Sequence, residues 1–320
     1  MIPVDRLCNY RFAVMAFLFL GFAGGKLMAE EKKEPNESKY FTTGWNFDTS
    51  YPKAEENKEK GGFFDFSQPF DEWPRKQKVV ALNLAVVGTI AVVGAVSWDY
   101  GSTSFHFQNE GWFDRDTKYG GADKLGHAFG AYALTSAYNY LYKQWGYSEE
   151  EAIWGGALSS WSQMTLIEVG DGFSSENGFS WEDELMNTIG VGMAYLRHRY
   201  PSIRNKFDFR MEWFPSSEFL HGNQSDPFTD YSGQKYLIAL KPDGFLKTDN
   251  PMLKAMELQF GYFTRGYDGD DATDRHRSTY VGIGLNVTYL LEQLTGHDAW
   301  HVFDYYQVPY TYVSSSSRYD

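Results

Sequence analysis

Long apolar runs fill the middle of the chain and predict helices. Residues 79–98 contain one strongly polar side chain, Asn83. A helix of that length would be about 30 Å long, which is the thickness of a bilayer core. Further helices are predicted at residues 123–145, 148–169 and 180–200. Small residues recur along these last three segments and would let the helices pack closely.

Two of these helices carry a start signal. Ser148 with Glu151, and Ser180 with Asp183, have the spacing of a capping box, in which each side chain bonds the backbone N–H of the other residue. Pro201 ends the last helix, because proline disfavours helical backbone in the residue before it. We therefore expect an apolar up-down bundle of four helices.

After Pro201 the apolar positions alternate with a period of two, which is typical of strands. The first alternating segment is residues 207–213. The longest covers residues 280–291, where one face carries Val281, Ile283, Leu285, Val287, Tyr289 and Leu291. Other strands are expected at residues 235–241, 254–266 and 301–313, and a separate one at 41–48. The five or six strands expected here are too few for a closed transmembrane barrel, which needs about eight. The fold class is therefore predicted as α+β, a four-helix apolar bundle followed by a small antiparallel β region.

The N-terminus has the pattern of a Sec-type signal peptide. Arg6 and Arg11 precede a short apolar run, and Ala29 offers a small residue for cleavage. The alternative is a retained anchor helix, because Leu27 is not small. The chain is divided into a signal peptide (1–29), a polar linker with one candidate strand (30–74), the helical bundle (75–200) and an aromatic-rich β region (201–320).

Composition narrows the classes of partner. The formal net charge of −13 argues against a nucleic-acid binder, since phosphate contacts need basic stripes. Aromatic residues make up 18% of the chain, which suits β-structure and membrane interfaces. The only cysteine, Cys8, precedes the apolar run, so it cannot carry a lipid at a mature N-terminus. We expect membrane lipid or other envelope proteins as partners, and no nucleic acid.

Two signals disagree about the membrane. Short connections would place Arg75 and Arg197 at one end of the bundle, and Asp99 and Asp171 at the other. In an inner-membrane protein the basic end would be cytoplasmic, whereas a cleaved signal peptide leaves the start of the first helix outside. We give the signal peptide more weight and expect an exported protein that is periplasmic or associated with the outer membrane.

Three polar pairs fall at helical spacing close to helix ends. They are Asp123 with His127, Glu168 with Asp171, and Asp183 with Asn187. In an up-down bundle these three ends lie on the same side. Glu168 would face the negative end of its helix dipole, so a positive group is expected beside it: Lys124, a protonated His127 or a metal ion.

These residues also have structural explanations. Asp123 could cap a helix, Asp183 fits a capping box, and His127 and Asn187 could be satisfied core groups. The alternative is a functional site in which the candidate catalytic residues are His127, Glu168 and Asp171. The candidate metal ligands are Asp123, His127, Glu168, Asp171 and Asp183, with Lys124 and Asn187 completing the polar cluster. The cofactor is open, and a divalent metal is the candidate considered.

The same segments resemble a known family. Residues 121–134 (GADKLGHAFGAYAL), 168–173 (EVGDGF) and 183–190 (DELMNTIG) are similar to the YfiM-like family of unknown function, labelled predicted periplasmic lipoproteins. The resemblance extends over residues 75–290 or so, and the motifs are more remotely similar to VanZ-like membrane proteins. It implies an envelope location and no established activity. This chain departs from the lipoprotein label because no cysteine stands where a lipid would attach.

Two further patterns carry less information. Asp268, Asp270, Asp271 and Asp274 resemble a calcium loop, but the glycine and glutamate of an EF-hand are missing, so an acidic hairpin tip is favoured. No G-x-S-x-G motif supports a serine hydrolase.

A structural or scaffolding role is the first hypothesis. The alternatives are a membrane-associated hydrolase, metal-assisted or acid–base, on a lipid-linked or phosphorylated envelope substrate, and a binder of lipid headgroups. Whether the protein is an enzyme stays open.

The signal peptide can be tested directly. N-terminal sequencing of protein recovered from the cell envelope should begin near Glu30, because cleavage is expected after Ala29. A Met1 terminus on protein extracted from membranes would instead identify the apolar run as a retained anchor.

Overall fold

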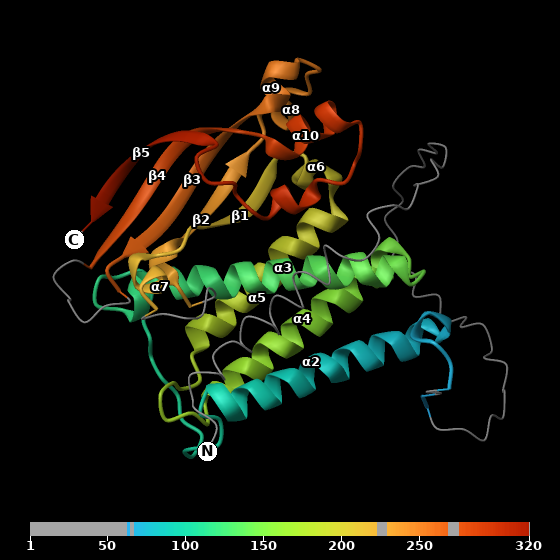
Figure 1. The fold of residues 1–320 in the computed structure, drawn as a ribbon, viewed down its shortest axis with the longest axis vertical. Coiled ribbons are helices and arrows are strands. Elements are labelled where there is room, and N and C mark those ends of the chain that lie inside the picture. Colours follow the sequence, from blue (N-terminus) through green and yellow to red (C-terminus); the bar gives the residue numbers. More distant parts are fainter. Residues whose placement is uncertain (1–62, 65–66, 223–228, 268–274, 320) are drawn as a thin grey trace, which may run out of the picture.

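The computed structural model describes residues 63–64, 67–222, 229–267 and 275–319. The expected signal peptide, the candidate strand at residues 41–48 and the acidic segment 268–274 lie outside the described residues. In the described part, a helical bundle is followed along the chain by an antiparallel sheet, so the predicted α+β class is confirmed (Figure 1).

The bundle consists of four long helices whose ends lie within a few residues of the predicted ones. They are α2 (Arg75–Ser97), α3 (Ala122–Gln144), α4 (Glu149–Asp171) and α5 (Trp181–Arg199). The capping box at the start of α4 is confirmed, because Ser148 Oγ accepts from Glu151 N and Ser148 N donates to Glu151 Oε2. At the start of α5, Ser180 Oγ accepts from Asp183 N at 3.2 Å, but the Asp183 carboxylate turns into the bundle.

Helix α3 is the centre of the molecule, between the sheet and the remaining helices (Figure 1). Phe129 and Tyr132 on one face of α3 pack against Phe209 of the sheet, with ring centroids 5.6 Å apart in each case. On another face α5 approaches so closely that a Cβ on Gly190 would lie 2.0 Å from the backbone oxygen of Ala128. Small side chains permit this contact between helix backbones.

The sheet is a five-stranded meander with the strand order β1-β2-β3-β4-β5. Its strands are β1 (Phe207–Trp213), β2 (Gln234–Leu240), β3 (Met256–Arg265), β4 (His276–Leu285) and β5 (Tyr312–Tyr319). Short helices in the described residues are η2 (Phe70–Glu72), η3 (Lys118–Gly121), α6 (Pro201–Arg204), α7 (Ser217–Leu220), η4 (Tyr231–Gly233), α8 (Pro242–Leu246), α9 (Pro251–Ala255), α10 (Val287–Thr295) and η6 (His301–Asp304).

Two of the expected strands were partly wrong. The alternation over residues 280–291 continues beyond β4, but Asn286 Oδ1 accepts from Tyr289 N and starts helix α10. The apolar residues of this segment also satisfy a helical period, so local capping decides its structure. The strand expected at residues 301–313 is a short helix, η6, and a loop that lead into β5.

Polar and apolar residues occupy unexpected faces of the sheet. Asp208, Arg210 and Glu257 are almost fully buried, whereas Val281 and Ile283 are about half exposed. The buried charges form a network in which Arg210 contacts Asp208 at 2.6 Å and Glu257 at 2.8 Å. The apolar face is therefore exposed on β3 and β4, whereas on β1 and β2 the same face packs against α3 through Phe209 and Tyr236.

Helix α2 is the described helix that is long and apolar enough to cross a membrane. Only 17% of its most apolar window is buried by the rest of the protein. Large residues such as Leu84, Val92 and Val96 are more than half exposed. Hydrogen bonds between polar side chains connect α2 to the bundle instead. Asn83 Nδ2 donates to Tyr142 OH, and Gln163 Nε2 donates to Asn83 Oδ1.

The close contact at Gly190 gives a matched pair of mutations. Gly190→Ala should destabilise the protein by about 1–3 kcal/mol, because the new methyl group must displace a backbone carbonyl. Gly192→Ala on the same helix meets nothing within 4 Å and should stabilise by up to about 1 kcal/mol through helix propensity. Thermal unfolding of both variants measures the difference, and equal stabilities would contradict the close packing.

Candidate functional site

The polar residues predicted from helix spacing meet at one end of the bundle. His127 and Lys124 of α3, Glu168 of α4, and Asp183 and Asn187 of α5 come into mutual contact there. The prediction that these three helix ends lie together is therefore confirmed. We call this group the bundle-end cluster; its full membership is Tyr100, Glu110, Lys118, Asp123, Lys124, His127, Glu168, Asp171, Asp183 and Asn187.

Lys124 is the centre of the cluster, and its side chain is completely buried. Its ammonium nitrogen lies 2.5 Å from Glu110 Oε2, 2.9 Å from Asp123 Oδ2 and 2.8 Å from Asp183 Oδ1. Burial favours loss of the proton, but the three carboxylates outweigh burial and raise the pKa of Lys124. Lys124 is therefore a fixed positive charge.

Three members of the cluster have no signal in the helix spacing. Glu110 and Tyr100 come from the loop between α2 and η3, and Lys118 begins η3. Lys118 Nζ donates to Glu110 Oε1 at 2.6 Å, while the hydroxyl of Tyr100 donates to the backbone oxygen of Ile167 at 3.0 Å. Sequence reasoning missed them because loop residues have no periodicity that assigns them to a face.

The backbone before α3 is unusual and sets the position of the cluster. Tyr119, Gly120 and Gly121 all have positive φ angles, of 50°, 61° and 82°. A non-glycine residue in this region is strained, and such strain persists only where the surroundings hold it. A Cβ on Gly121 would lie 2.6 Å from the Phe113 ring. This turn directs Asp123 and Lys124 inward at the first turn of α3.

His127 lies between two helices with both ring nitrogens facing polar groups. Nδ1 is 3.3 Å from Asn187 Oδ1 and 3.2 Å from Glu168 Oε1. Since an amide oxygen can only accept, the Asn187 contact places the proton on Nδ1 of a neutral imidazole. Nε2 then carries the lone pair and faces Asp183 Oδ1 at 3.9 Å, which is too long for a hydrogen bond.

The cluster carries more negative than positive charge. Its five carboxylates face two lysines and one histidine, so at least two negative charges are uncompensated if every carboxylate is ionised. Burial, reinforced by Asp183 and Asp171, raises the pKa of Glu168 to about 8. Burial also raises the pKa values of Asp123 and Asp171 to about 6. The protein relieves the excess charge by holding protons near neutral pH.

His127 responds to the same charges in the opposite sense. Burial acts to lower its pKa, but the carboxylates of Asp183 and Glu168 outweigh burial and raise it. Several buried atoms of the cluster also lack a partner with hydrogen-bond geometry: Asp123 Oδ1, Glu168 Oε1 and Asn187 Nδ2. Native proteins rarely leave such atoms unsatisfied.

Two sets of three candidate ligands converge in the cluster and share Asp183. His127, Glu168 and Asp183 each place one ligand atom within 4.8 Å of the others, and so do Glu110, Asp123 and Asp183. Asp171, also predicted as a ligand, lies in neither set. Lys124 contacts all three carboxylates of the second set, but in the first set it contacts only Asp183. The first set is therefore the better candidate cation site.

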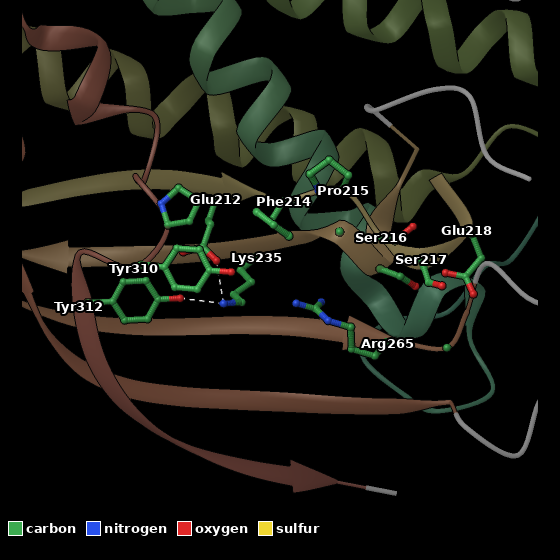
Figure 2. Close-up of a pocket in the computed structure, with 14 residues that line it drawn as sticks. Glu212, Phe214, Pro215, Ser216, Ser217, Glu218, Lys235, Arg265, Tyr310 and Tyr312 are labelled. Atoms are coloured by element: carbon green, nitrogen blue, oxygen red, sulfur yellow. Dashed lines mark hydrogen bonds and ion pairs between the residues drawn. The ribbon is translucent and has the colours of Figure 1, made fainter. Parts of the chain in front are cut away.

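Other polar groups of the described chain lie elsewhere. A more exposed trio, Glu292, Asp298 and His301, also has metal-ligand spacing. A cavity of about 500 Å³ lies beside the sheet (Figure 2). In its lining, Lys235 contacts Glu212 at 2.7 Å and Tyr312 OH at 2.8 Å. None of the residues predicted as a site lines this cavity.

Comparison with known proteins gives one match. Residues 109–199 match the model of a family described as predicted periplasmic lipoprotein (DUF2279). The matched segment contains every member of the bundle-end cluster except Tyr100. No curated protein and no solved structure matches the chain. The family description agrees with the predicted location: this is an exported envelope protein, periplasmic or associated with the outer membrane.

The raised pKa of Glu168 predicts a specific pH dependence. The folded protein keeps this proton up to about pH 8, whereas an unfolded chain releases it near the ordinary value of 4.5. Stability should therefore fall as pH rises through this window, by at most about 1.4 kcal/mol per pH unit. The Glu168→Gln variant has no ionisable group at this position. In buffer with a chelator, its stability relative to that of wild type should therefore increase between about pH 5 and pH 8.

The control for this experiment is Asp249→Asn, which removes an exposed carboxylate whose pKa Lys254 lowers. That carboxylate is ionised across the whole window, so this variant should follow the wild-type pH profile. Parallel profiles for wild type and Glu168→Gln would show that Glu168 is ionised in the folded protein.

Proposed function

We propose that the bundle-end cluster binds a divalent cation through His127, Glu168 and Asp183. The observation that carries the proposal is the convergence of one ligand atom from each residue within 4.8 Å. Glu168 Oε1 is buried without a hydrogen-bonding partner. A cation would supply the positive charge that the cluster lacks.

The separations suit a metal ion. Imidazole nitrogens and carboxylate oxygens bind zinc at about 2.0–2.2 Å, so two ligands at a tetrahedral angle lie about 3.5 Å apart. The 3.9 Å between His127 Nε2 and Asp183 Oδ1 is close to that value. Asn187 accepts from the opposite ring nitrogen and would orient the imidazole, as outer partners of metal-binding histidines do.

The chemistry that we propose for this site is hydrolysis of a phosphorylated or lipid-linked envelope substrate. A cation bound there would polarise a phosphoryl or carbonyl oxygen. Asp171 lies outside the three ligands and is partly buried beside them, so we assign it the uptake and release of the proton. In this proposal His127 is a ligand of the cation and not the general acid–base group.

The resemblance to YfiM-like and VanZ-like proteins belongs to the same proposal. It rests on three motifs, D-K-x-x-H at 123–127, E-x-x-D-G at 168–172 and D-x-x-x-N at 183–187. These motifs contribute most of the residues that meet in the cluster. A shared site chemistry would account for their similarity.

A second candidate function is purely structural. Lys124 joins the start of α3 to α5 and to the loop that carries Glu110, without any added ion. Such a buried charge network would fasten the ends of the bundle together in a scaffolding protein. Removal of one partner from a buried pair leaves an uncompensated charge and costs about 3–5 kcal/mol.

Thermal unfolding with added metal separates the two candidates. In the cation-binding proposal, Mg²⁺, Ca²⁺, Mn²⁺ or Zn²⁺ raises the melting temperature of wild type, since a ligand of the folded state adds to its stability. Glu168→Gln and His127→Ala should lose this response. A tenfold loss in affinity removes about 1.4 kcal/mol of stabilisation when the metal is well above its Kd in both proteins.

The matched control is His301→Ala, because Glu292, Asp298 and His301 form the other described trio of a histidine and two carboxylates with ligand spacing. This variant should keep the wild-type metal response. A wild-type protein that none of the four cations stabilises would exclude the cation site and favour the scaffolding role.

A further inference from the structure

Four phenylalanine rings gather on two loops at the same end of the bundle. Phe105 and Phe107 lie in the loop between α2 and η3, and Phe173 and Phe179 lie in the loop between α4 and α5. Neighbouring ring centroids are 5.2–6.0 Å apart. Phe107 is 72% exposed, and Phe105 and Phe173 are each 40% exposed. We call these four residues the Phe cluster.

The two loops are joined by backbone hydrogen bonds, so the rings sit on a fixed support. Gln108 N donates to Phe179 O, and Phe179 N donates to His106 O, both at 3.0 Å. His106 N donates to Gly172 O at 2.9 Å. A Cβ on Gly172 would lie 2.3 Å from the Phe105 ring, so this ring rests directly on backbone. The exposed rings therefore form an ordered aromatic surface.

A second exposed apolar surface lies on helix α2, which leads into the first of these loops. The ring of Tyr100 inserts between Gly94 of α2 and Gly170 of α4, where an added Cβ would lie about 2 Å from it. Val92 and Val96 lie two residues from Gly94, on the side of α2 away from Tyr100, and are 64% and 62% exposed. An exposed apolar surface of this kind marks a site of contact with protein or membrane.

A lipid bilayer fits this surface best. The adjoining helix α2 has the length and the mean hydropathy, 2.4, of a segment in contact with lipid, and it is mostly unburied. The exposed carboxylates on these two loops are those of Asp99, Asp114, Asp116 and Glu176, so these loops offer no basic patch for anionic lipid. Contact would depend on the aromatic rings themselves, which favour the boundary between headgroups and acyl chains.

We propose that the Phe cluster inserts into the surface layer of a lipid bilayer and holds the bundle-end cluster near the lipid headgroups. The first of these loops carries Tyr100 and Glu110, and the second runs between Asp171 and Asp183. The same loops therefore join the Phe cluster to the bundle-end cluster. The insertion stands without the cation site. Only its consequence, that the substrate is a lipid with a phosphorylated headgroup, rests on the proposed function.

The test labels one position with an environment-sensitive dye. Cys8 is the only cysteine, so full-length Cys8→Ser protein with Phe107→Cys carries a single thiol for a nitrobenzoxadiazole label. Phosphatidylcholine vesicles containing doxyl-labelled lipid should shift its emission to the blue and quench it. The control is Asp249→Cys in the same background, an exposed position on the loop before α9, which should show neither change.

The mode of attachment gives a second readout. Quenching at position 107 should persist in about 1 M salt, where charge interactions are screened beyond roughly 3 Å. Dependence on added phosphatidylglycerol would overturn hydrophobic insertion. Unquenched emission from vesicle-bound protein would overturn the proposal. A blue shift without vesicles that disappears on dilution would assign the rings to contact between copies and would overturn it too.

The two proposals can be contradicted separately. Quenching of the label tests membrane insertion, and the melting temperature of the same protein with added metal tests the cation site. A metal-dependent melting temperature without quenching would leave the cation site and remove the membrane contact. Quenching without any response to metal would leave the membrane contact and remove the cation site.

Discussion

The buried ammonium group of Lys124 is the constraint on which the arrangement of the bundle end depends. An ammonium ion removed from water needs negative partners at close range, and Lys124 has them in Glu110, Asp123 and Asp183. Those partners come from a loop, from α3 and from α5, so one charge fixes three segments. With α5 fixed in this way, Asp183 and Asn187 face His127, and His127 in turn faces Glu168.

The described part of the protein contains two buried charge networks, and their balance separates their roles. In the sheet network Arg197, Arg210 and Lys241 face an equal number of carboxylates from Asp208, Glu257 and Asp304. The charges of this set balance, which suits a structural role. The bundle-end cluster, by contrast, has more carboxylates than positively charged groups. Excess negative charge in a buried place needs protons or a cation, and either one gives the site a possible chemistry.

The distribution of apolar side chains is consistent with an envelope location. Helix α2, the Phe cluster and one face of β3 to β5 expose large apolar residues, while charged residues fill the interior of the sheet. Burial of apolar area is what normally stabilises a protein in water. A chain that leaves so much of this area uncovered needs another apolar phase or a partner, and export to the envelope provides both.

The sequence by itself determined the helices, three of the strands and the residues at the helix ends. Apolar runs, capping boxes and Pro201 act over a few residues. They predicted the ends of α3 to α5 to within two residues and those of α2 to within four, and they brought His127, Glu168 and Asp183 to one side. The tertiary structure alone decided which carboxylates pair with Lys124, that Asp171 lies apart from the candidate ligands, and that Glu110, Lys118 and Tyr100 join the cluster. The physical reason is that loop positions and charge compensation depend on contacts distant in sequence, which local periodicity does not encode.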